Sequence, residues 1–442
     1  MSTKYSGKNT HKTQINNKKT RNNKARRRQS TPLFAFGLTL GVVLLLGAVA
    51  IICIVLPKHV KEVTTQQIVS YNVPIEAIPE PVKEEVIETM EVLGANAATT
   101  KYGDVIRDEN YLKENNIFLK EAGSEDVVTL GFIGDILFDD EYSVMSSLKL
   151  RGGNLSASMS EDTLNRMNNV DVMVVNNEFP YTERGSRLPN KQFNFHADYD
   201  TAFYLNDMGA DVAIIANNHV YDYGEEGLLD TIDTLNNVGV HPLGAGRNLE
   251  EAVQPVYYII NDIKIALVAA SQIERLDNPD TKGATKDSPG VFRCWNNDLI
   301  YTAVNVAKQN ADFVIVCVHW GTEKDPVPDC WQTQMAPKLA EAGADLIIGD
   351  HTHRLQGIYY YGNTPCIYSL GNFWFNGTTT DTGMVEVSID KNGLKSFQFL
   401  PAIQSNYSTN LVYDGEKQRI INYLKSLSKG VDIDEEGFVT KK

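Results

Sequence analysis

The stretch VVTLGFIGDILF at residues 127–138 is apolar at nearly every position until its end. Four further runs have the same form: VDVMVVNNEF (170–179), DVAIIANNH (211–219), DFVIVCVHWG (312–321) and DLIIGDHTH (345–353). Runs that are apolar at consecutive positions are typical of strands buried on both faces of a sheet. We therefore expect these five runs to form the centre of the fold.

Helix-like stretches lie between these runs, at residues 225–239, 297–310 and 331–343, with Gly at or near their ends as a C-cap signal. Alternating strands and helices indicate an α/β domain. Further strand-like runs, without helices between them toward the end of the chain, lie at residues 264–271, 364–375, 384–390 and 394–403. Together these patterns predict two packed mixed β-sheets with helices outside.

The predicted strands end in side chains that can carry chemistry. In open α/β sheets, ligand sites collect beyond the carboxyl ends of the strands. Five strand ends present such groups: Asp135; Asn177 and Glu178; Asn217, Asn218 and His219; His319; and Asp350, His351 and His353. The coincidence of five strand ends favours a functional site.

Taken singly, these residues also have structural explanations. Asp135 could cap a turn, Glu178 could be a solvated loop acid, and His319 could be a core histidine. Asn218 and His219 could form a network that closes a loop. The pair His351-x-His353 is the most specific local signal, because alternate residues of an extended segment point to the same side and can bind one metal site.

The donor atoms in this set are carboxylate and amide oxygens and imidazole nitrogens, without a thiolate. Such a mixture suits Mn²⁺, Zn²⁺ or Fe²⁺ better than a soft ion. Two ions bridged by a carboxylate would activate water for a displacement at phosphorus. A histidine beside them could protonate the leaving oxygen.

Six blocks of the sequence carry a family resemblance: GFIGDILF, NNEFP, ANNHVYDYGEEGLLDTIDTL, VIVCVHWGTE, IIGDHTHRLQG and YSLGNFWF. In this order they resemble the CapA family of poly-γ-glutamate capsule biosynthesis proteins, which is related to the calcineurin-like metallophosphoesterases. The resemblance runs from about Val127 to Asn376. It implies a calcineurin-like α/β/β/α fold and a metal-dependent hydrolase-like domain that takes part in making, exporting or attaching an anionic capsule polymer, with other membrane capsule-synthesis subunits as partners.

The resemblance also implies roles for individual residues. His219 would be the general acid. The metal ligands would be Asp135 and His353 for the first ion, Asn218, His319 and His351 for the second, and Glu178 as the bridge.

The sequence departs from the phosphoesterase pattern at two positions. Leu137 stands where the first block would usually have a histidine ligand, and the bridging acid is Glu178 where an aspartate is usual. A mononuclear or weakly loaded site is therefore an alternative to a dinuclear one.

Three further residues are candidates for substrate binding. Trp320 could form a wall for substrate or simply pack in the core. Arg354 could pair with an anionic substrate or with an acid of the domain itself. Asn372 could approach the metal site or only form a turn. The residues after the NNH block could orient His219 or merely turn the chain: Tyr221, Asp222 and Gly224.

The N-terminal part of the chain indicates membrane insertion. Residues 1–30 carry ten basic side chains and no acid, and the 24 residues from Leu33 to Leu56 contain no acid or base. A helix of that length reaches about 36 Å, enough to cross the ~30 Å hydrocarbon core of a bilayer. The basic flank predicts a cytoplasmic N-terminus. A cleaved signal peptide and a buried core helix are the alternatives.

We therefore predict a single-pass cell-membrane protein with its main domain outside. Its parts would be a basic cytoplasmic tail (1–32), a transmembrane helix (33–56), a stem (57–125), a CapA-like metallophosphoesterase-type domain (126–405) and a C-terminal extension with one helix and a polar tail (406–442). Four cysteines would face an oxidising exterior: Cys294, Cys317, Cys330 and Cys366. They could form one or two disulfides or stay buried thiols.

The charge excludes one class of partner. The formal net charge is −15, and removing the +10 of residues 1–30 leaves −25 on residues 31–442. A nucleic-acid partner is not expected, because phosphate recognition needs a basic face. Three functions stay open: a capsule protein with a hydrolase-like domain, an extracellular phosphoesterase unrelated to capsule, and a non-catalytic assembly subunit.

Overall fold

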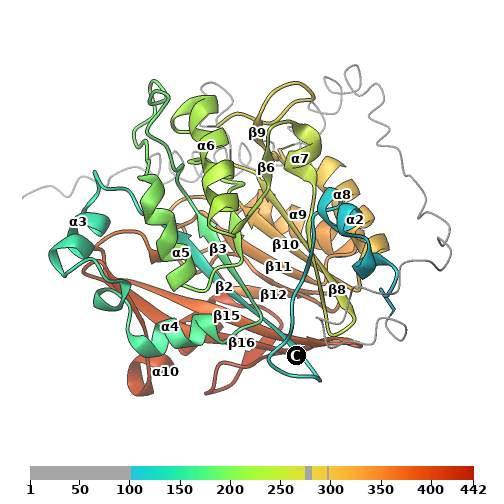
Figure 1. Ribbon diagram of the computed structural model, residues 1–442. Coiled ribbons are helices and arrows are strands. Elements are labelled where there is room, and N and C mark those ends of the chain that lie inside the picture. The colour runs from blue at the N-terminus through green and yellow to red at the C-terminus, as the bar shows by residue number, and fades with distance from the viewer. Residues whose placement is uncertain (1–100, 274–280, 296–297) are drawn as a thin grey trace, which may run out of the picture. The chain divides into compact units, whose positions relative to one another are not determined.

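The computed structural model describes residues 101–273, 281–295 and 298–442 (Figure 1). Two large β-sheets organise these residues. The seven-stranded sheet has the order β1 (Ile117–Leu119), β7 (Val256–Ile260), β8 (Ile263–Ser271), β10 (Phe313–His319), β11 (Leu346–Asp350), β13 (Thr364–Ile367) and β12 (Ile358–Tyr361). The prediction of a mixed α/β fold with two packed sheets is confirmed.

The eight-stranded sheet contains most of the C-terminal strands. Its order is β17 (Ser408–Leu411), β16 (Gly393–Ser405), β15 (Thr380–Asp390), β2 (Val128–Ile136), β3 (Val172–Asn177), β4 (Val212–Ile214) and β5 (His241–Leu243), with β14 (Asn372–Trp374) also paired to β2. Two small two-stranded sheets complete the set: β18 (Val431–Ile433) with β19 (Val439–Lys441), and β6 (Ala245–Gly246) with β9 (Gly290–Val291).

Three buried apolar clusters show how the layers are stacked. One cluster lies between the large sheets and joins Leu130 and Val174 of one sheet to Ile265 and Ile315 of the other. The two remaining clusters lie on the outer faces, each between a sheet and its helices. Figure 1 shows the sheets lying between these two groups of helices. The order of layers is therefore helix, sheet, sheet, helix.

The helices are short and mostly amphipathic. Those that contribute buried residues to the outer cluster of the eight-stranded sheet are α3 (Ser143–Leu150), α4 (Glu161–Asn168), α5 (Phe203–Asp207) and α6 (Gly224–Asn237). The seven-stranded sheet is covered by α7 (Leu249–Val253), α8 (Asp298–Asn310) and α9 (Cys330–Ala342), together with α2 (Glu109–Glu114). Helix α10 (Asp414–Leu427) instead buries Ile420, Ile421 and Leu424 in the cluster between the sheets.

Helix α9 illustrates how local sequence fixes an element. The side chain of Asp329 accepts from the backbone N–H of Gln332, and the Gln332 side chain accepts from the N–H of Asp329, which is a capping box. Gly343 ends the helix with a φ of 117°, a conformation that suits glycine. The predicted C-cap at the end of 331–343 is therefore correct.

Parallel pairing brings the polar strand ends to one edge. Strands β8, β10, β11 and β13 are mutually parallel, as are β2, β3, β4 and β14. In the registers of these pairs, His319 lies opposite Asp350, and Asp135 lies opposite both Asn176 and Asn372. Gly134 allows the approach of β14, because a Cβ there would lie 1.9 Å from the carbonyl oxygen of Gly371.

Both ends of the described chain differ from the sequence prediction. Residues 101–125, assigned to the stem, contain η1 (Val105–Arg107), α2 and β1, and β1 pairs in parallel with β7. Residues 406–442 contain α10 as predicted, but the expected polar tail forms β18 and β19, and β17 extends the larger sheet. Three- and four-residue strands are too short to show a periodic pattern, so only pairing with a neighbour identifies them.

Two further sequence expectations concern the membrane span and the cysteines. The predicted span 33–56 lies outside the described residues, and no helix within the described ranges is long and apolar enough to cross a membrane. Of the two alternatives for the cysteines of the described chain, the structure has buried thiols at Cys294, Cys317 and Cys366, whereas Cys330 is partly exposed.

Candidate metal centre

The six predicted metal ligands come together at the edge where the two sheets meet. Around Nε2 of His319 lie Oδ1 of Asn218 at 2.8 Å, Nδ1 of His351 at 3.0 Å and Oε1 of Glu178 at 3.4 Å. Three atoms that can each donate a lone pair thus lie within 3.4 Å of a fourth, although the four come from separate segments. This is the arrangement expected of ligands to a single cation.

A second group of ligand atoms adjoins the first. Nδ1 of His353 lies 2.9 Å from Oδ2 of Asp135 and 2.7 Å from Oδ1 of Asn372. Glu178 is common to both groups, since its carboxylate lies with His319 and His351 on one side and with Asp135 and His353 on the other. Glu178 therefore occupies the place of a bridging carboxylate between two positions.

The histidines at 351 and 353 reach the centre by a route that the sequence reasoning had wrong. The pattern His351-x-His353 predicts an extended segment with both side chains on the same side. Instead, β11 ends at Asp350, and His351 and His353 have positive φ values of 94° and 55°. Such backbone conformations are unfavourable for residues with a Cβ and are found where the surroundings enforce them, often at functional sites.

The carboxylates of the centre are buried and short of donors. Neither oxygen of Glu178 accepts a hydrogen bond within the described chain, Oδ2 of Asp135 has its contact with Nδ1 of His353, and both carboxylate side chains are fully buried. Asp350 is also buried, and its Oδ1 has no hydrogen bond either. A buried charge without compensation is costly. The residues therefore fit a divalent cation, which would compensate this charge and occupy these oxygens.

The pKa shifts of the residues in the centre also fit a bound cation. Burial, reinforced by the charge of Asp135, raises the pKa of Glu178 well above its ordinary value. Burial alone would lower the pKa of His353, but the charge of Glu178 and the hydrogen bond to Asp135 raise it to about 10. Burial lowers the pKa of His319 to about 3, which keeps this ring neutral and able to donate a lone pair.

Leu137, the position without a histidine, contributes no ligand. Its side chain is buried in the apolar cluster between the eight-stranded sheet and its helices. Asn372 is the additional polar group beside Asp135 and His353, because β14 pairs with β2 at this level. The first metal position therefore has an amide oxygen nearby and no second imidazole beside that of His353.

The predicted general acid, His219, is held by a carboxylate. Its Nδ1 lies 2.7 Å from Oδ2 of Asp222, and both side chains are buried. Asn217 fixes the turn, because its Oδ1 accepts from the backbone N–H of His219 and of Val220. Of the two roles left open for Asp222, orienting His219 is the one for which the structure provides the contact.

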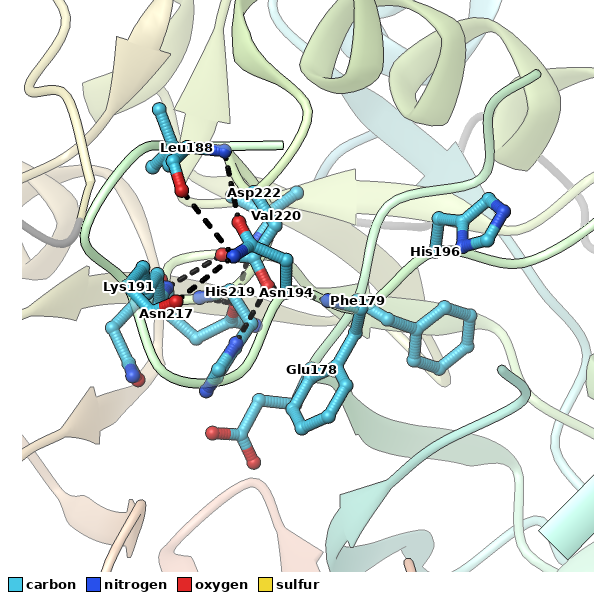
Figure 2. Close-up of polar contacts among 12 residues, drawn as sticks. Glu178, Phe179, Leu188, Lys191, Asn194, His196, Asn217, His219, Val220 and Asp222 are labelled. Atoms are coloured by element: carbon cyan, nitrogen blue, oxygen red, sulfur yellow. Dashed lines mark hydrogen bonds and ion pairs between the residues drawn. The ribbon is translucent and has the colours of Figure 1, made fainter. Parts of the chain in front are cut away.

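Several residues near the centre were not selected from the sequence. Asn176 places its Nδ2 2.7 Å from Oδ1 of Asp135 and 3.3 Å from Nδ1 of His319, so it orients one ligand from each group. Lys191 contacts Asp222 from a loop that follows β3 (Figure 2). Asn176 could have been found, since it belongs to the polar end of a predicted strand. Lys191 lies in a polar segment without a period, so no local signal marks it.

The three candidates for substrate binding lie in different surroundings. Trp320 is fully buried in the outer cluster of the seven-stranded sheet, and its Nε1 donates to the carbonyl oxygen of Tyr368 at 2.9 Å. Of the two roles left open for Trp320, packing in the core is the one for which the structure provides the contacts, because Trp320, which follows the last residue of β10, lies in the outer apolar cluster. Arg354 is exposed and forms no hydrogen bond or ion pair with the described site residues. Asn372 alone lies in the cluster.

Fold and centre together define a class: a two-sheet α/β domain with a buried carboxylate–histidine cluster at the carboxyl ends of its strands. Residues 129–377 match the family model described as bacterial capsule synthesis protein PGA_cap, and the chain belongs to this family. The expected membership of the CapA family is thereby confirmed.

Two relatives and one solved structure illustrate the similarities. The PGA biosynthesis protein CapA of Bacillus subtilis (strain 168) is 31% identical over 285 residues, covering 63% of this chain and 72% of the relative. The capsule biosynthesis protein CapA of Bacillus anthracis is 31% identical over 278 residues, covering 60% and 66%. A 5'-nucleotidase structure from Candida albicans SC5314 aligns with 64% of this chain and 53% of its own at 9% identity, with a TM-score of 0.33, which is too low to support an argument.

Proposed function

We propose that the chain is a membrane-anchored cell-envelope protein whose main domain holds a metal-dependent hydrolase centre of the calcineurin-like metallophosphoesterase type. It would act in the synthesis, export or attachment of a poly-γ-glutamate-type capsule polymer. Membership of the capsule synthesis family supports the process. The helix–sheet–sheet–helix layering and the carboxylate–histidine cluster support the chemistry.

One observation carries the chemical part of the proposal. The carboxylate of Glu178 is fully buried, accepts no hydrogen bond from any residue that the structure describes, and lies between two groups of ligand atoms. A carboxylate so placed is explained by cation binding. The residues that would hold one or two ions are Asp135, Glu178, Asn218, His319, His351 and His353, and such ions supply Lewis acidity and lower the pKa of water.

The chain's own residues would provide orientation and proton transfer. Asp222 fixes the ring of His219 through Nδ1, so that Nε2, once it has taken up a proton from solvent, can donate that proton to a leaving oxygen. Asn176 holds Asp135 and His319 in place and limits their side-chain freedom. Because the cluster is buried at the meeting of two sheets, little water surrounds these groups, and their electrostatic interactions are strong.

The cellular location is part of the same proposal. The uncharged run 33–56 and the basic residues before it support a single membrane span with the N-terminus inside. The centre would then face the cell exterior, where a capsule polymer is found. An anionic polymer would be repelled by a domain with excess acid unless bound metal or local basic groups offset that charge.

Metal analysis of the purified full-length chain tests the centre. We expect close to stoichiometric metal in the wild type and its loss in His351→Ala and Asn218→Ala. His241→Ala, which removes a histidine outside the cluster, is the matched control and should keep the metal. Hydrolysis of p-nitrophenyl phosphate and bis-p-nitrophenyl phosphate should disappear in the two ligand variants.

Capsule formation by the same variants separates the three functions. Loss of metal, hydrolysis and capsule together would support the proposal. Loss of metal and hydrolysis with normal capsule would instead indicate a phosphoesterase acting elsewhere. A wild-type protein without metal, and normal capsule in both ligand variants, would leave the assembly role and refute a hydrolase.

A further inference from the structure

A polar loop between β3 and the 3-10 helix η3 (Tyr199–Ala202) closes over the buried pair His219–Asp222. We call residues 185–196 the β3–η3 loop. Its Leu188 N–H donates to the backbone carbonyl of Asp222 at 2.9 Å, and its Phe195 N–H donates to Oδ2 of the same residue at 2.7 Å. The ring of Phe195 also lies 4.3 Å from that of His219. The loop thus contacts Asp222 through two backbone groups.

Lys191 is the charged member of this loop. Its Nζ lies 2.5 Å from Oδ1 of Asp222, where the side chain of Lys191 is 7% exposed and that of Asp222 is 0% exposed. The same ammonium group donates to the backbone carbonyl of Asn218. Asn218 is the residue whose side chain lies beside His319 in the candidate metal centre. Lys191 therefore contacts both the partner of the general acid and a proposed metal ligand.

The loop is itself fixed, so that Lys191 is presented in one position. The side chain of Asn194 accepts from the N–H of Leu188 at 2.9 Å and donates to the carbonyls of Leu188 and Lys191, at 3.3 Å in each case. At the end of the loop, the His196 N–H donates to Asp139. Figure 2 shows Lys191 and Asn194 beside Asp222, with the His196 ring pointing away from this group.

The two carboxylate oxygens of Asp222 have different partners. Oδ1 receives the ammonium of Lys191, and Oδ2 receives the Phe195 N–H and faces Nδ1 of His219. A buried carboxylate needs a compensating charge, and Lys191 supplies it. With Oδ1 held, rotation of the carboxylate is prevented and Oδ2 stays directed at the imidazole.

We propose that Lys191 is a positioning residue: by holding Asp222, it keeps the Nδ1–H of His219 on that carboxylate and Nε2 directed outward, where the ring takes up a second proton from solvent and passes it to the leaving oxygen. This inference rests on the proposed role of His219 as general acid. It adds a residue that touches neither the reacting atoms nor a metal ion. The alternative is an ion pair that only stabilises the fold.

The tautomer of His219 is measured without any substrate. The full-length chain, labelled with ¹⁵N in its eight histidines, is studied by long-range ¹H–¹⁵N correlation spectra, with His219→Gln for assignment. We expect the Nδ1–H pattern for His219 in the wild type and in Lys191→Arg. In Lys191→Met this pattern should change to Nε2–H or to an exchange average.

Turnover of bis-p-nitrophenyl phosphate gives the functional readout. Partners that orient a reacting or ligating side chain typically contribute about 10–100-fold to activity. We expect Lys191→Met to lower kcat by this factor at unchanged KM and unchanged metal content, and Lys191→Arg to restore most of it. Lys308→Met is the matched control, because Lys308 also pairs with a carboxylate, Asp345 at 2.6 Å, far from the centre in the fold.

The outcomes separate this inference from the proposed function. An unchanged Nδ1–H pattern in Lys191→Met, or equal losses of kcat in Lys191→Met and Lys308→Met, would overturn the positioning role. If the wild type shows no hydrolysis, the hydrolase proposal fails, while the tautomer measurement still decides the contact. If Lys191→Met does not fold, Lys191→Gln replaces it; an amide cannot supply the charge, so the same change in tautomer is required.

Discussion

Replacing Glu178 by glutamine is the perturbation that the structure makes most informative. In Glu178→Gln the shape is kept and the negative charge is removed. Both oxygens of Glu178 are buried and have no hydrogen bond among residues 101–273, 281–295 and 298–442, and one of them lies 3.4 Å from Nε2 of His319. Glutamine also leaves two polar atoms buried here, so the two proteins differ only in the charge, and an ionised buried group without a partner costs about 1–3 kcal/mol more than a neutral one. In the absence of metal, the variant should therefore be more stable than the wild type by about 1–3 kcal/mol.

Added metal should reverse this order. A ligand that binds the folded state stabilises it by about 2.7 kcal/mol at a concentration 100 times its Kd. The wild type should gain this amount with Mn²⁺ or Zn²⁺, whereas the neutral amide of Glu178→Gln is a poor bridge between two ligand groups and should gain little. In a chain of this size, 1 kcal/mol corresponds to a change of about 2 °C in Tm.

Calorimetric unfolding of the full-length protein measures both effects, first with chelator and then with each metal. Glu386→Gln is the control, because Glu386 is paired with Arg166 at 2.8 Å outside the centre. This control should be slightly less stable than the wild type and should keep the full metal-induced shift. The reasoning would be refuted by a metal-free Glu178→Gln protein that is clearly less stable than the wild type, or by equal metal shifts in the two proteins.

Three further predictions concern the surroundings of the centre. Trp320→Phe removes the hydrogen bond to the Tyr368 carbonyl and should lower the free energy of unfolding by about 1–3 kcal/mol without changing KM, which denaturation and kinetics check together. Burial lowers the pKa of His241 from 6.5 to about 4, so that the unfolded protein binds a proton at this histidine at a higher pH than the folded protein does. Urea titrations should therefore show that the free energy of unfolding falls by about 2–3 kcal/mol as the pH falls from 6.5 to 4. The variant His241→Phe should show little of this loss. Gly134→Ala places a Cβ against the Gly371 carbonyl and should destabilise the fold by about 3 kcal/mol or more, with loss of bound metal; a stable, metal-loaded variant would contradict the packing argument.

The sequence by itself determined the layered fold and the composition of the centre. Apolar runs such as 127–138 and 312–321 record burial on both faces of a strand, and this information is local. Because parallel strands end at the same edge, the polar residues after each run could be assigned to one place before any distance was known. The cluster around Glu178, including Asn218 and His319, follows from that rule.

The tertiary structure decided how those residues meet, and which neighbours act on them. The left-handed backbone at His351 and His353 is imposed by packing and leaves no trace in an apolar period. Trp320 lies on the face opposite His319, and Lys191 reaches Asp222 from a loop 31 positions away in the chain. Hydrophobic periodicity encodes which face of an element is buried. It carries no information on which distant polar side chains become neighbours, because that depends on how the sheets, loops and turns pack in three dimensions.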